Sequence, residues 1–418
     1  VRFLPRQMRA GLYRHHIHCD MAPSSNLVFK LAETREELEA CFRLLHDAYV
    51  EAGFMQPQSH GLRATLFHAL PTTSTLLAKY HNRVIGTVSL IRESNLGFPL
   101  QKVFNIEAVR KTGGNIAEVS ALAIEKRFRG AMGTVLFPLL KFMYEYATRC
   151  FDTRHLLIAV NPRHIDFYEA ILFFQRLRQN PVEHYDFANG APAVGAHLDL
   201  ASAPEIYRQC YDTFEPDKNL YRYFIKHELP NIHYPEKRFY TTNDPVMTPE
   251  LLDYFFNQKT QLFASLPPDV VSALHGIYDL EAYQHCLPQL PQQPLLSGED
   301  RRQHRRFFIS CPGEVTLAEE SGANRAIPIT VLECSTFWLR SEVKQPLALD
   351  QNCQLNIQLG AQENSRLQTR VTRRATTQRD VYVFQIEQAD LAWQKFVSAL
   401  NKASTHQELE HATRFLEI

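Results

Sequence analysis

Residues 116–174 constrain the fold of this chain more than any other stretch. Two apolar segments, 117–124 and 155–160, have the length and composition of buried strands, and a basic glycine-containing loop and an apolar helical pattern separate them. The second segment runs into Asn161-Pro162, where the proline holds its predecessor extended and ends the strand. A strand, a helix and a second strand in this order predict a parallel β-α-β unit, and hence an α/β domain.

The residues around this unit complete one α/β domain, which we predict over 27–201. Thr34 and Glu37 stand three apart before a run with helical spacing, so they predict a capping box that opens a helix over 34–52. Residues 76–91 predict a hairpin, because two apolar segments flank a short polar turn. The other predicted elements are helices at 104–111, 138–150 and 163–172 and closing strands at 173–178 and 193–200.

The rest of the chain changes pattern several times. Residues 1–26 are basic without an apolar core and predict a disordered leader, whereas 202–287 carry helical patterns rich in aromatic residues and predict a helical connector. Three prolines mark a linker at 288–299. Residues 300–400 contain closely spaced strand patterns with no helix between them, which predicts a small all-β barrel, and 401–418 predict a C-terminal helix.

Composition excludes several classes of function. The formal net charge is zero, with 45 basic and 45 acidic residues, so no charge excess points to nucleic acid as a partner. No run of 18 or more apolar residues occurs, so we expect no transmembrane segment. The eight cysteines lack any Cys-x-x-Cys pair, which favours free thiols in a cytoplasmic protein. His15, His16, His18 and Cys19 could hold a metal, but we interpret them as leader and predict no metal site.

Glu118 and Ser120 lie among apolar residues of the predicted strand 117–124. A buried carboxylate is costly unless it has a partner or a chemical task. Glu118 could accept a proton from an attacking amine, and desolvation would raise its pKa toward a useful value. The alternative is a structural ion pair with Arg92 or Arg110.

The loop and the helix that follow add candidate binding groups. Arg127, Arg129 and Gly130 precede a helix, where backbone N–H groups and positive charge can hold a phosphate, although a solvated basic turn would look the same. Tyr168, on the helix after Asn161-Pro162, could protonate a departing thiolate or simply pack beside its neighbours. His164 could contact substrate or lie on the helix surface.

These motifs in this order resemble the GCN5-related N-acetyltransferase superfamily. EVSALAI matches its fourth strand, RFRGAMG its pyrophosphate loop, and NPRHIDFYEAILFF its later strand–helix unit. With LLHDAYVEAGF and GTVSLIRESNLGFPLQKVFNIEAVRKTGG, the match over about 27–200 resembles the long-chain N-acyl amino acid synthases, relatives of the acyl-homoserine-lactone synthases. The resemblance implies two neighbouring parallel strands that splay apart around a thioester arm.

The resemblance also implies a reaction and its site. The donor would be a fatty acyl chain on the phosphopantetheine of acyl carrier protein, and the acceptor the α-amine of an amino acid. Glu118 would be the base, and the wider superfamily suggests Tyr168 as the acid. A long-chain product would draw the protein to the periphery of the inner membrane. The residues expected to bind substrates are Ser120, Leu122, Arg127, Arg129, Gly130, Asn161 and His164.

Two details bear on the donor and on the acyl chain. Met132 occupies a position where the superfamily has glycine or alanine, and Pro138 implies a late helix start, so the loop suits the pyrophosphate of coenzyme A poorly. Acyl carrier protein is therefore the favoured donor, acyl-CoA the less favoured one, and a coenzyme A-dependent acetyltransferase of small amines the alternative enzyme. Besides Leu122, the expected lining of the acyl pocket is Ile124, Leu136, Phe137 and Phe173.

The C-terminal β pattern resembles a PilZ domain, a receptor for cyclic di-GMP. Arg302 and Arg306 match the Arg-x-x-x-Arg motif of that family, and Ser335 matches the serine of its second motif. Glu333 stands where the family has aspartate or asparagine, and Trp338 where it has a glycine that permits close backbone approach. The resemblance implies cyclic di-GMP as an effector, and leaves a non-catalytic signalling protein as the alternative to an enzyme.

Overall fold

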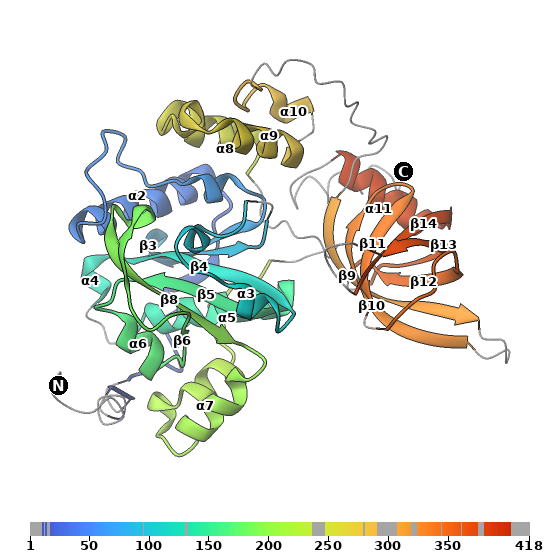
Figure 1. Cartoon of the computed structure of the whole chain (residues 1–418). Coiled ribbons are helices and arrows are strands. Elements are labelled where there is room, and N and C mark those ends of the chain that lie inside the picture. Colours follow the sequence, from blue (N-terminus) through green and yellow to red (C-terminus); the bar gives the residue numbers. More distant parts are fainter. Residues whose placement is uncertain are drawn as a thin grey trace. The chain divides into compact units, whose positions relative to one another are not determined.

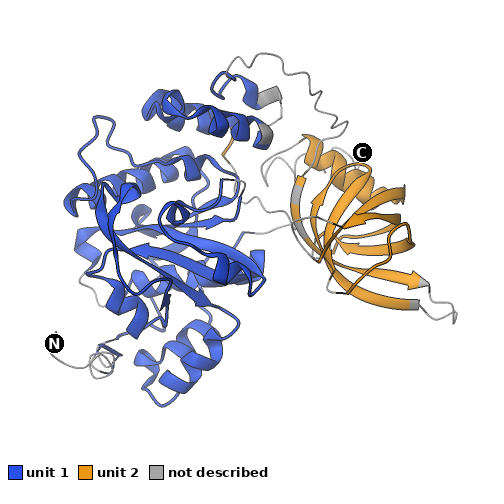
Figure 2. Cartoon of the chain, viewed as in Figure 1, with its two compact units in different colours: residues 1–235, 249–290 blue, residues 236–248, 291–418 orange. Residues whose placement is uncertain are grey.

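The computed structural model describes residues 11, 13–14, 17–94, 96–129, 133–235, 247–278, 281–290, 307–318, 324–343, 345–360, 362–374 and 380–402. The chain divides into two compact units (Figure 2). The first comprises residues 1–235 and 249–290, and the second comprises 236–248 and 291–418.

An eight-stranded sheet forms the centre of the first unit, in the order β1-β2-β3-β4-β5-β8-β6, with β7 paired to β8. Every pairing is antiparallel except that of β4 with β5. The predicted β-α-β unit is therefore present, inside a mixed sheet. The strands are β1 Leu27–Leu31, β2 Thr73–Tyr80, β3 Arg83–Arg92, β4 Asn115–Ile124, β5 Thr153–Val160, β6 Gln175–Arg176, β7 Val182–Tyr185 and β8 Ala191–Asp199.

Helices cover both faces of this sheet, with α2 and α5 on opposite sides (Figure 1). α2 begins where predicted, because the Thr34 side chain accepts a hydrogen bond from the Glu37 N–H. Gly86 of β3 lets α5 approach closely, since a Cβ there would lie 3.1 Å from Val135 and 3.6 Å from Leu139. The helices are α2 Arg35–Glu51, η1 Leu66–Ala69, η2 Pro99–Lys102, α3 Glu107–Arg110, α4 Lys126–Arg129, α5 Leu136–Phe151, α6 Ile165–Ala170, η3 Asp186–Ala188 and α7 Ala203–Tyr211.

Part of the predicted leader differs from the disorder expected of it. Ile17 and Cys19 are buried in the core of the first unit, and the Cys19 N–H donates to the carbonyl of Asp217. The Arg14 guanidinium donates to the carbonyl of Ala170 at the end of α6. The apolar side chains of this segment are thus removed from water by contacts that its own sequence does not reveal.

The predicted helical connector is not a separate element either. Its first part shares the core of the sheet, where Tyr211 and Tyr223 are fully buried. Its second part packs on the α2 side, because the ring of Phe255 meets Phe42 edge-on at 5.1 Å. The segment comprises η4 Pro216–Lys218, the π-helices η5 Arg222–Lys226 and η6 Asp253–Lys259, and η7 Leu262–Ser265, α8 Pro249–Leu252, α9 Pro268–Ile277 and α10 Glu281–Gln284.

The second unit is the predicted barrel. Six antiparallel strands close in the order β10-β11-β14-β13-β12-β9, and α11 contributes Trp393 and Phe396 to their apolar core. Asp390 caps α11 and accepts a hydrogen bond from the Trp393 N–H. A closed barrel of this kind is compatible with the predicted PilZ-like domain. Its elements are β9 Phe307–Ala318, β10 Asn324–Cys334, β11 Trp338–Val343, β12 Asn352–Gln358, β13 Asn364–Arg374, β14 Val381–Ala389 and α11 Leu391–Lys402.

Two general predictions can be compared with the structure. All eight cysteines are free, and all but Cys150 and Cys210 are buried, as expected for thiols that serve as small apolar groups. Within the described ranges, no helix is both long enough and apolar enough to cross a membrane.

Candidate active site

A gap in the sheet separates β4 from β5. The two strands pair in parallel from Asn115 opposite Thr153 up to Glu118 opposite Leu157, and no further. β5 nevertheless stays paired with β8 as far as Val160, and β4 stays paired with β3 as far as Ile124. Beyond Glu118, the edges of β4 and β5 that face each other therefore form no β-sheet pairing with one another. This is the splayed geometry that the sequence resemblance implies.

Glu118 stands at the start of this gap. Its side chain is 1 % exposed, and burial raises the pKa of its carboxyl to about 8, although the N–H of Leu100 donates to Oε2 at 3.1 Å. The ion pair considered as an alternative is absent, because Arg110 instead binds Glu93 and Glu107, and Arg92 donates to Ser74 and to the carbonyl of Pro71. A buried carboxyl without a cationic partner is suited to proton transfer near neutral pH.

The α2 face of the sheet carries Glu118 and three further groups near it. Tyr185, at the end of β7, is 3 % exposed, and its pKa is raised mainly by burial and further by the charge of Glu118. Tyr49 of α2 also raises this pKa, whereas the guanidinium of Arg63 lowers it. Tyr185, Tyr49 and Arg63 were not predicted as site residues. Arg63 lies in a loop and Tyr185 at the end of β7, and the helical spacing of Tyr49 within α2 marks it equally well as a packing residue.

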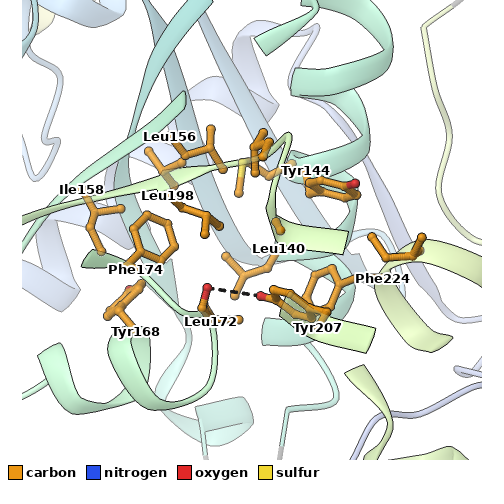
Figure 3. A pocket seen from close by; sticks show the side chains of 15 residues that line it. Leu140, Tyr144, Leu156, Ile158, Tyr168, Leu172, Phe174, Leu198, Tyr207 and Phe224 are labelled. Atoms are coloured by element: carbon orange, nitrogen blue, oxygen red, sulfur yellow. Dashed lines mark hydrogen bonds between the residues drawn. The ribbon is translucent and has the colours of Figure 1, made fainter. Parts of the chain in front are cut away.

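An apolar pocket lies on the opposite face of the sheet, against α5 (Figure 3). Val119, which follows Glu118 and points the other way, lines it beside Ile158. The empty space, including its open mouth, is about 570 Å³. The other lining residues are Leu140, Met143, Tyr144, Leu156, Tyr168, Leu172, Phe174, Leu198, Leu200, Ala203, Tyr207, Phe224 and Ile225.

Tyr168 belongs to this pocket and not to the environment of Glu118. Its half-buried ring meets Phe174 edge-on at 5.9 Å, as Figure 3 shows. Burial raises the pKa of Tyr168 to about 12, and Tyr49 adds to the rise. The structure therefore brings the two predicted catalytic residues to opposite faces of the sheet. The charge of Tyr49 contributes to the raised pKa of both Tyr168 and Tyr185.

The residues predicted to line an acyl pocket lie outside the lining of this pocket. Leu122 is partly buried against the core further along β4 but does not line the pocket. Ala121 has a left-handed backbone with φ of 54° and lies where the pairing with β3 shifts register, so simple alternation fails beyond it. Ile124, Leu136, Phe137 and Phe173 also lie outside the lining, which α7 and η5 complete from the supposed connector.

The basic loop already has acidic partners. Arg127 donates to Glu125 at 2.8 Å, and Arg129 donates to Glu51 at 2.7 Å. Lys126 pairs with the same Glu51 at 2.7 Å. A phosphate would have to displace these exposed ion pairs, which solvent screens. Gly130, also predicted here, lies outside the described residues.

The other predicted binding residues have local roles in the structure. The Asn161 side chain accepts a hydrogen bond from the N–H of Arg163 at 3.0 Å, which shapes the turn after β5. His164 is exposed at the N-terminus of α6. Ser120 is half-buried opposite Ser89, on the face of Glu118, and the Ser89 hydroxyl in turn lies 3.2 Å from His68 Nε2. Of these residues, Ser120 alone shares a face with Glu118.

The predicted nucleotide site of the barrel is described only in part. Ser335 is 2 % exposed, and its hydroxyl accepts a hydrogen bond from the Trp338 N–H at 3.1 Å inside the turn between β10 and β11. Phe337 and Trp338 are exposed beside it. Arg302 and Arg306 lie outside the described residues. The Ser335 hydroxyl therefore holds the turn and does not face solvent.

Comparison with protein families identifies the sheet-forming segment. Residues 40–199 match the family model described as "N-acyl amino acid synthase FeeM". The match confirms the predicted resemblance over this segment, which contains the gap and Glu118, and supports an acyltransferase. A search of curated proteins finds no match.

Several solved structures of acyl-transferring enzymes align with part of this chain. FeeM, an N-acyl amino acid synthase from uncultured soil microbes, is 23% identical and aligns over 43% of this chain and 93% of its own, with a TM-score of 0.36. The coenzyme A-dependent acyl-homoserine lactone synthase BjaI, solved with S-adenosylmethionine and isopentyl-CoA, is 18% identical over 51% of this chain and 95% of its own, also with a TM-score of 0.36. The acyl-homoserine lactone synthase LasI is 14% identical over 42% of this chain and 91% of its own, with a TM-score of 0.34.

Proposed function

We propose that the first unit transfers a long-chain acyl group from a phosphopantetheine thioester to the α-amine of an amino acid. The observation that carries this proposal is the free edge of β4 beyond Glu118. It offers backbone groups to an extended pantetheine arm, between a buried carboxyl on one face and an apolar pocket on the other.

The pocket suits the acyl chain of the donor. Its lining is almost wholly apolar, and burying each CH₂ of a chain contributes about 0.8 kcal/mol. The hydroxyl of Tyr207, the one drawn with a bond in Figure 3, already donates to the carbonyl of Leu172. The Tyr207 hydroxyl would therefore not be left unpaired by a hydrocarbon chain in this space.

The chemistry follows from the two faces. Glu118, when deprotonated, takes one proton from the neutral amine of the acceptor as that nitrogen attacks the thioester carbonyl carbon, and it later releases this proton to water. As the tetrahedral intermediate collapses, the amide bond remains and the C–S bond breaks. Tyr168, which burial keeps protonated, donates its proton to the departing thiolate and recovers one from water.

We propose acyl carrier protein as the donor in preference to acyl-CoA. Lys126, Arg127 and Arg129 are engaged with carboxylates, so a pyrophosphate would find little free positive charge among the described loop residues. Carrier-bound phosphopantetheine presents only one phosphate, so it needs less positive charge from the protein. Acyl transfer from acyl-CoA at the same efficiency as from acyl carrier protein would contradict this choice.

The decisive experiment combines donors, acceptors and one substitution. The protein is incubated with acyl carrier protein thioesters and pooled amino acids, and products are identified by mass spectrometry. We expect N-acyl amino acids from the wild type and a loss of at least about 100-fold in rate for Glu118→Gln, since general bases contribute roughly 10²–10⁴-fold. The exposed Glu183→Gln is the matched control. Robust acetylation of simple amines from acetyl-CoA, without carrier-dependent product, would favour the alternative enzyme instead.

We propose that the barrel regulates this reaction by binding cyclic di-GMP through Arg302 and Arg306. Two arginines four residues apart can hold phosphate oxygens bidentately. Because the Ser335 hydroxyl is buried in its turn, we expect Ser335→Ala to leave the affinity unchanged within about twofold, a shift of less than about 0.5 kcal/mol. Titration calorimetry with cyclic di-GMP measures the affinity of the full chain, of its Ser335→Ala variant and of the double variant Arg302→Ala/Arg306→Ala. Equal affinity of that double variant and the wild type would overturn the assignment.

A further inference from the structure

Arg63 is a half-buried cation whose charge is balanced by no carboxylate in the described part of the chain. Among the described residues, no Asp or Glu lies within salt-bridge distance of its guanidinium, whereas Arg110, Arg154 and Arg176 each pair with acidic side chains. Its one hydrogen bond runs from Nη2 to the carbonyl of Phe187 at 2.6 Å. A guanidinium has five N–H donors, so most of them remain available to a ligand.

Aromatic rings hold this guanidinium in place. Its central carbon lies 4.1 Å from the centre of the Tyr49 ring and 5.1 Å from that of Phe187. Tyr185 stacks on Phe187 with ring centres 5.8 Å apart. Rings that cover the faces of a guanidinium leave its edge open, and the edge is where a carboxylate binds with two parallel hydrogen bonds.

A second buried group near Arg63 lacks a partner. The hydroxyl of Tyr185 is buried and makes no hydrogen bond with any described residue, and such groups in folded proteins usually bind a ligand or water. The pKa of Tyr185 responds both to Glu118 and to Arg63, so the three side chains share one neighbourhood on the α2 face. This neighbourhood therefore holds a base, a cation and an unused hydroxyl.

We propose that Arg63 binds the α-carboxylate of the acceptor amino acid, with the Tyr185 hydroxyl as a second donor, and so aims the α-amine at Glu118. The inference rests on the proposed function and adds to it the recognition of the acceptor. It makes the free carboxylate a requirement for a good acceptor. Simple amines and amino acid amides, which lack that charge, bind poorly.

The test compares one amino acid with its own carboxamide. The best acceptor from the pooled reaction and its amide are assayed at saturating acyl donor with wild type, Arg63→Gln and Arg63→Lys. We expect the wild type to prefer the acid by at least about tenfold in kcat/KM, as loss of a hydrogen bond to a charged group implies. Arg63→Gln should raise the KM for the amino acid by about 10- to 100-fold and abolish this preference, while the KM for the donor changes less than about twofold.

Two controls separate recognition from stability. Arg43→Gln removes an exposed arginine that pairs with Glu39 on α2, and we expect it to keep the preference for the acid. Arg63→Lys keeps the charge without the planar fork, so its preference should be intermediate, and melting temperatures show whether either Arg63 variant is folded. If Arg63→Gln is unfolded, the comparison rests on Arg63→Lys.

The outcomes distinguish this inference from the proposed function. Wild-type synthesis of N-acyl amino acids with an unchanged acid-to-amide preference in the folded Arg63 variants would overturn the role of Arg63 alone. Wild type that acylates no amino acid would overturn the proposed function, and the carboxylate site with it. If the folded Arg63 variants lose the preference for the acid over the amide but still use the acyl donor, the result supports both the proposed function and the role of Arg63.

Discussion

At the scale of single residues, the environment of Glu118 decides its chemistry. Its strand position is visible in the sequence, but whether an arginine neutralises it is not. In the structure the possible partners are engaged elsewhere, and among the described residues only the Leu100 N–H stabilises the carboxylate. Burial therefore dominates and holds the pKa of Glu118 at about 8.

The raised pKa of Glu118 predicts how folding stability depends on pH. The folded state binds the Glu118 proton more tightly than the unfolded state, so this group's contribution is fully present below about pH 4.5 and is lost as pH rises through about 8. Relative to Glu118→Gln, the wild type should lose on the order of a few kcal/mol between pH 5 and 9, about 1.4 kcal/mol per unit of pKa shift. Urea unfolding of both proteins across this range measures the difference.

The control for this measurement is Glu183→Gln, at an exposed position of β7. Its stability curve should run parallel to that of the wild type. Parallel curves for Glu118→Gln as well would show that Glu118 titrates alike in both states.

At the scale of elements, the position of the proposed acyl pocket relative to the gap between β4 and β5 bears on the length of the acyl chain. Ile158 lies where β4 and β5 have already parted, whereas Leu156 lies where they are still paired. Leu200 lies near the start of β5, because its N–H donates to the carbonyl of Arg154. Ala203 follows Leu200 in the chain and lines the same pocket. Ala203 therefore marks the end of the pocket remote from the gap.

This geometry predicts control of chain length by Ala203. Ala203→Phe should fill the remote end and shift the preferred acyl chain to shorter donors, since each CH₂ excluded from the pocket forfeits about 0.8 kcal/mol, or roughly fourfold in specificity. Competition among carrier thioesters of different length, read by mass spectrometry, measures the shift. Ala201→Phe, at an exposed position two residues earlier, is the matched control. An unchanged chain-length profile in Ala203→Phe would place the acyl chain elsewhere.

At the scale of the whole molecule, the segment after β8 belongs to the catalytic unit. Tyr254 donates to Glu39 of α2 at 2.6 Å, and Tyr278 donates to the carbonyl of Ala69 at 2.5 Å. Phe255 and Phe256 are fully buried. The aromatic residues of 249–290 thus form part of the fold that supports Tyr49 and Arg63.

This assignment predicts where the chain can be shortened. A chain ending at Leu290 should fold and retain its acyl-transfer rate within about threefold, a change of less than about 0.7 kcal/mol in the barrier. A chain ending at Pro235 should lose much of its stability, because truncating even one buried phenylalanine costs about 3–5 kcal/mol. Thermal unfolding and the acyl-transfer assay test both. Equal stability of the two shortened chains would restore the interpretation of 202–287 as a mere connector.

The sequence by itself determined the features that depend on local order. The cap at Thr34, the strand ending at Asn161-Pro162, the β-α-β unit and the small β-barrel all follow from propensity, periodicity and turn chemistry within short windows. The predicted resemblance, and with it Glu118, also rests on residues that follow one another in order.

Tertiary structure alone decided which residues meet. Arg63 and Phe187 are 124 positions apart, and α7 lines the pocket together with residues of α5 that lie much earlier in the chain. The bulge at Ala121 shifts the lining away from the leucine that simple alternation selects. Such contacts depend on packing between distant segments, and a buried aromatic residue carries the same letter whether it fills a core or lines a pocket.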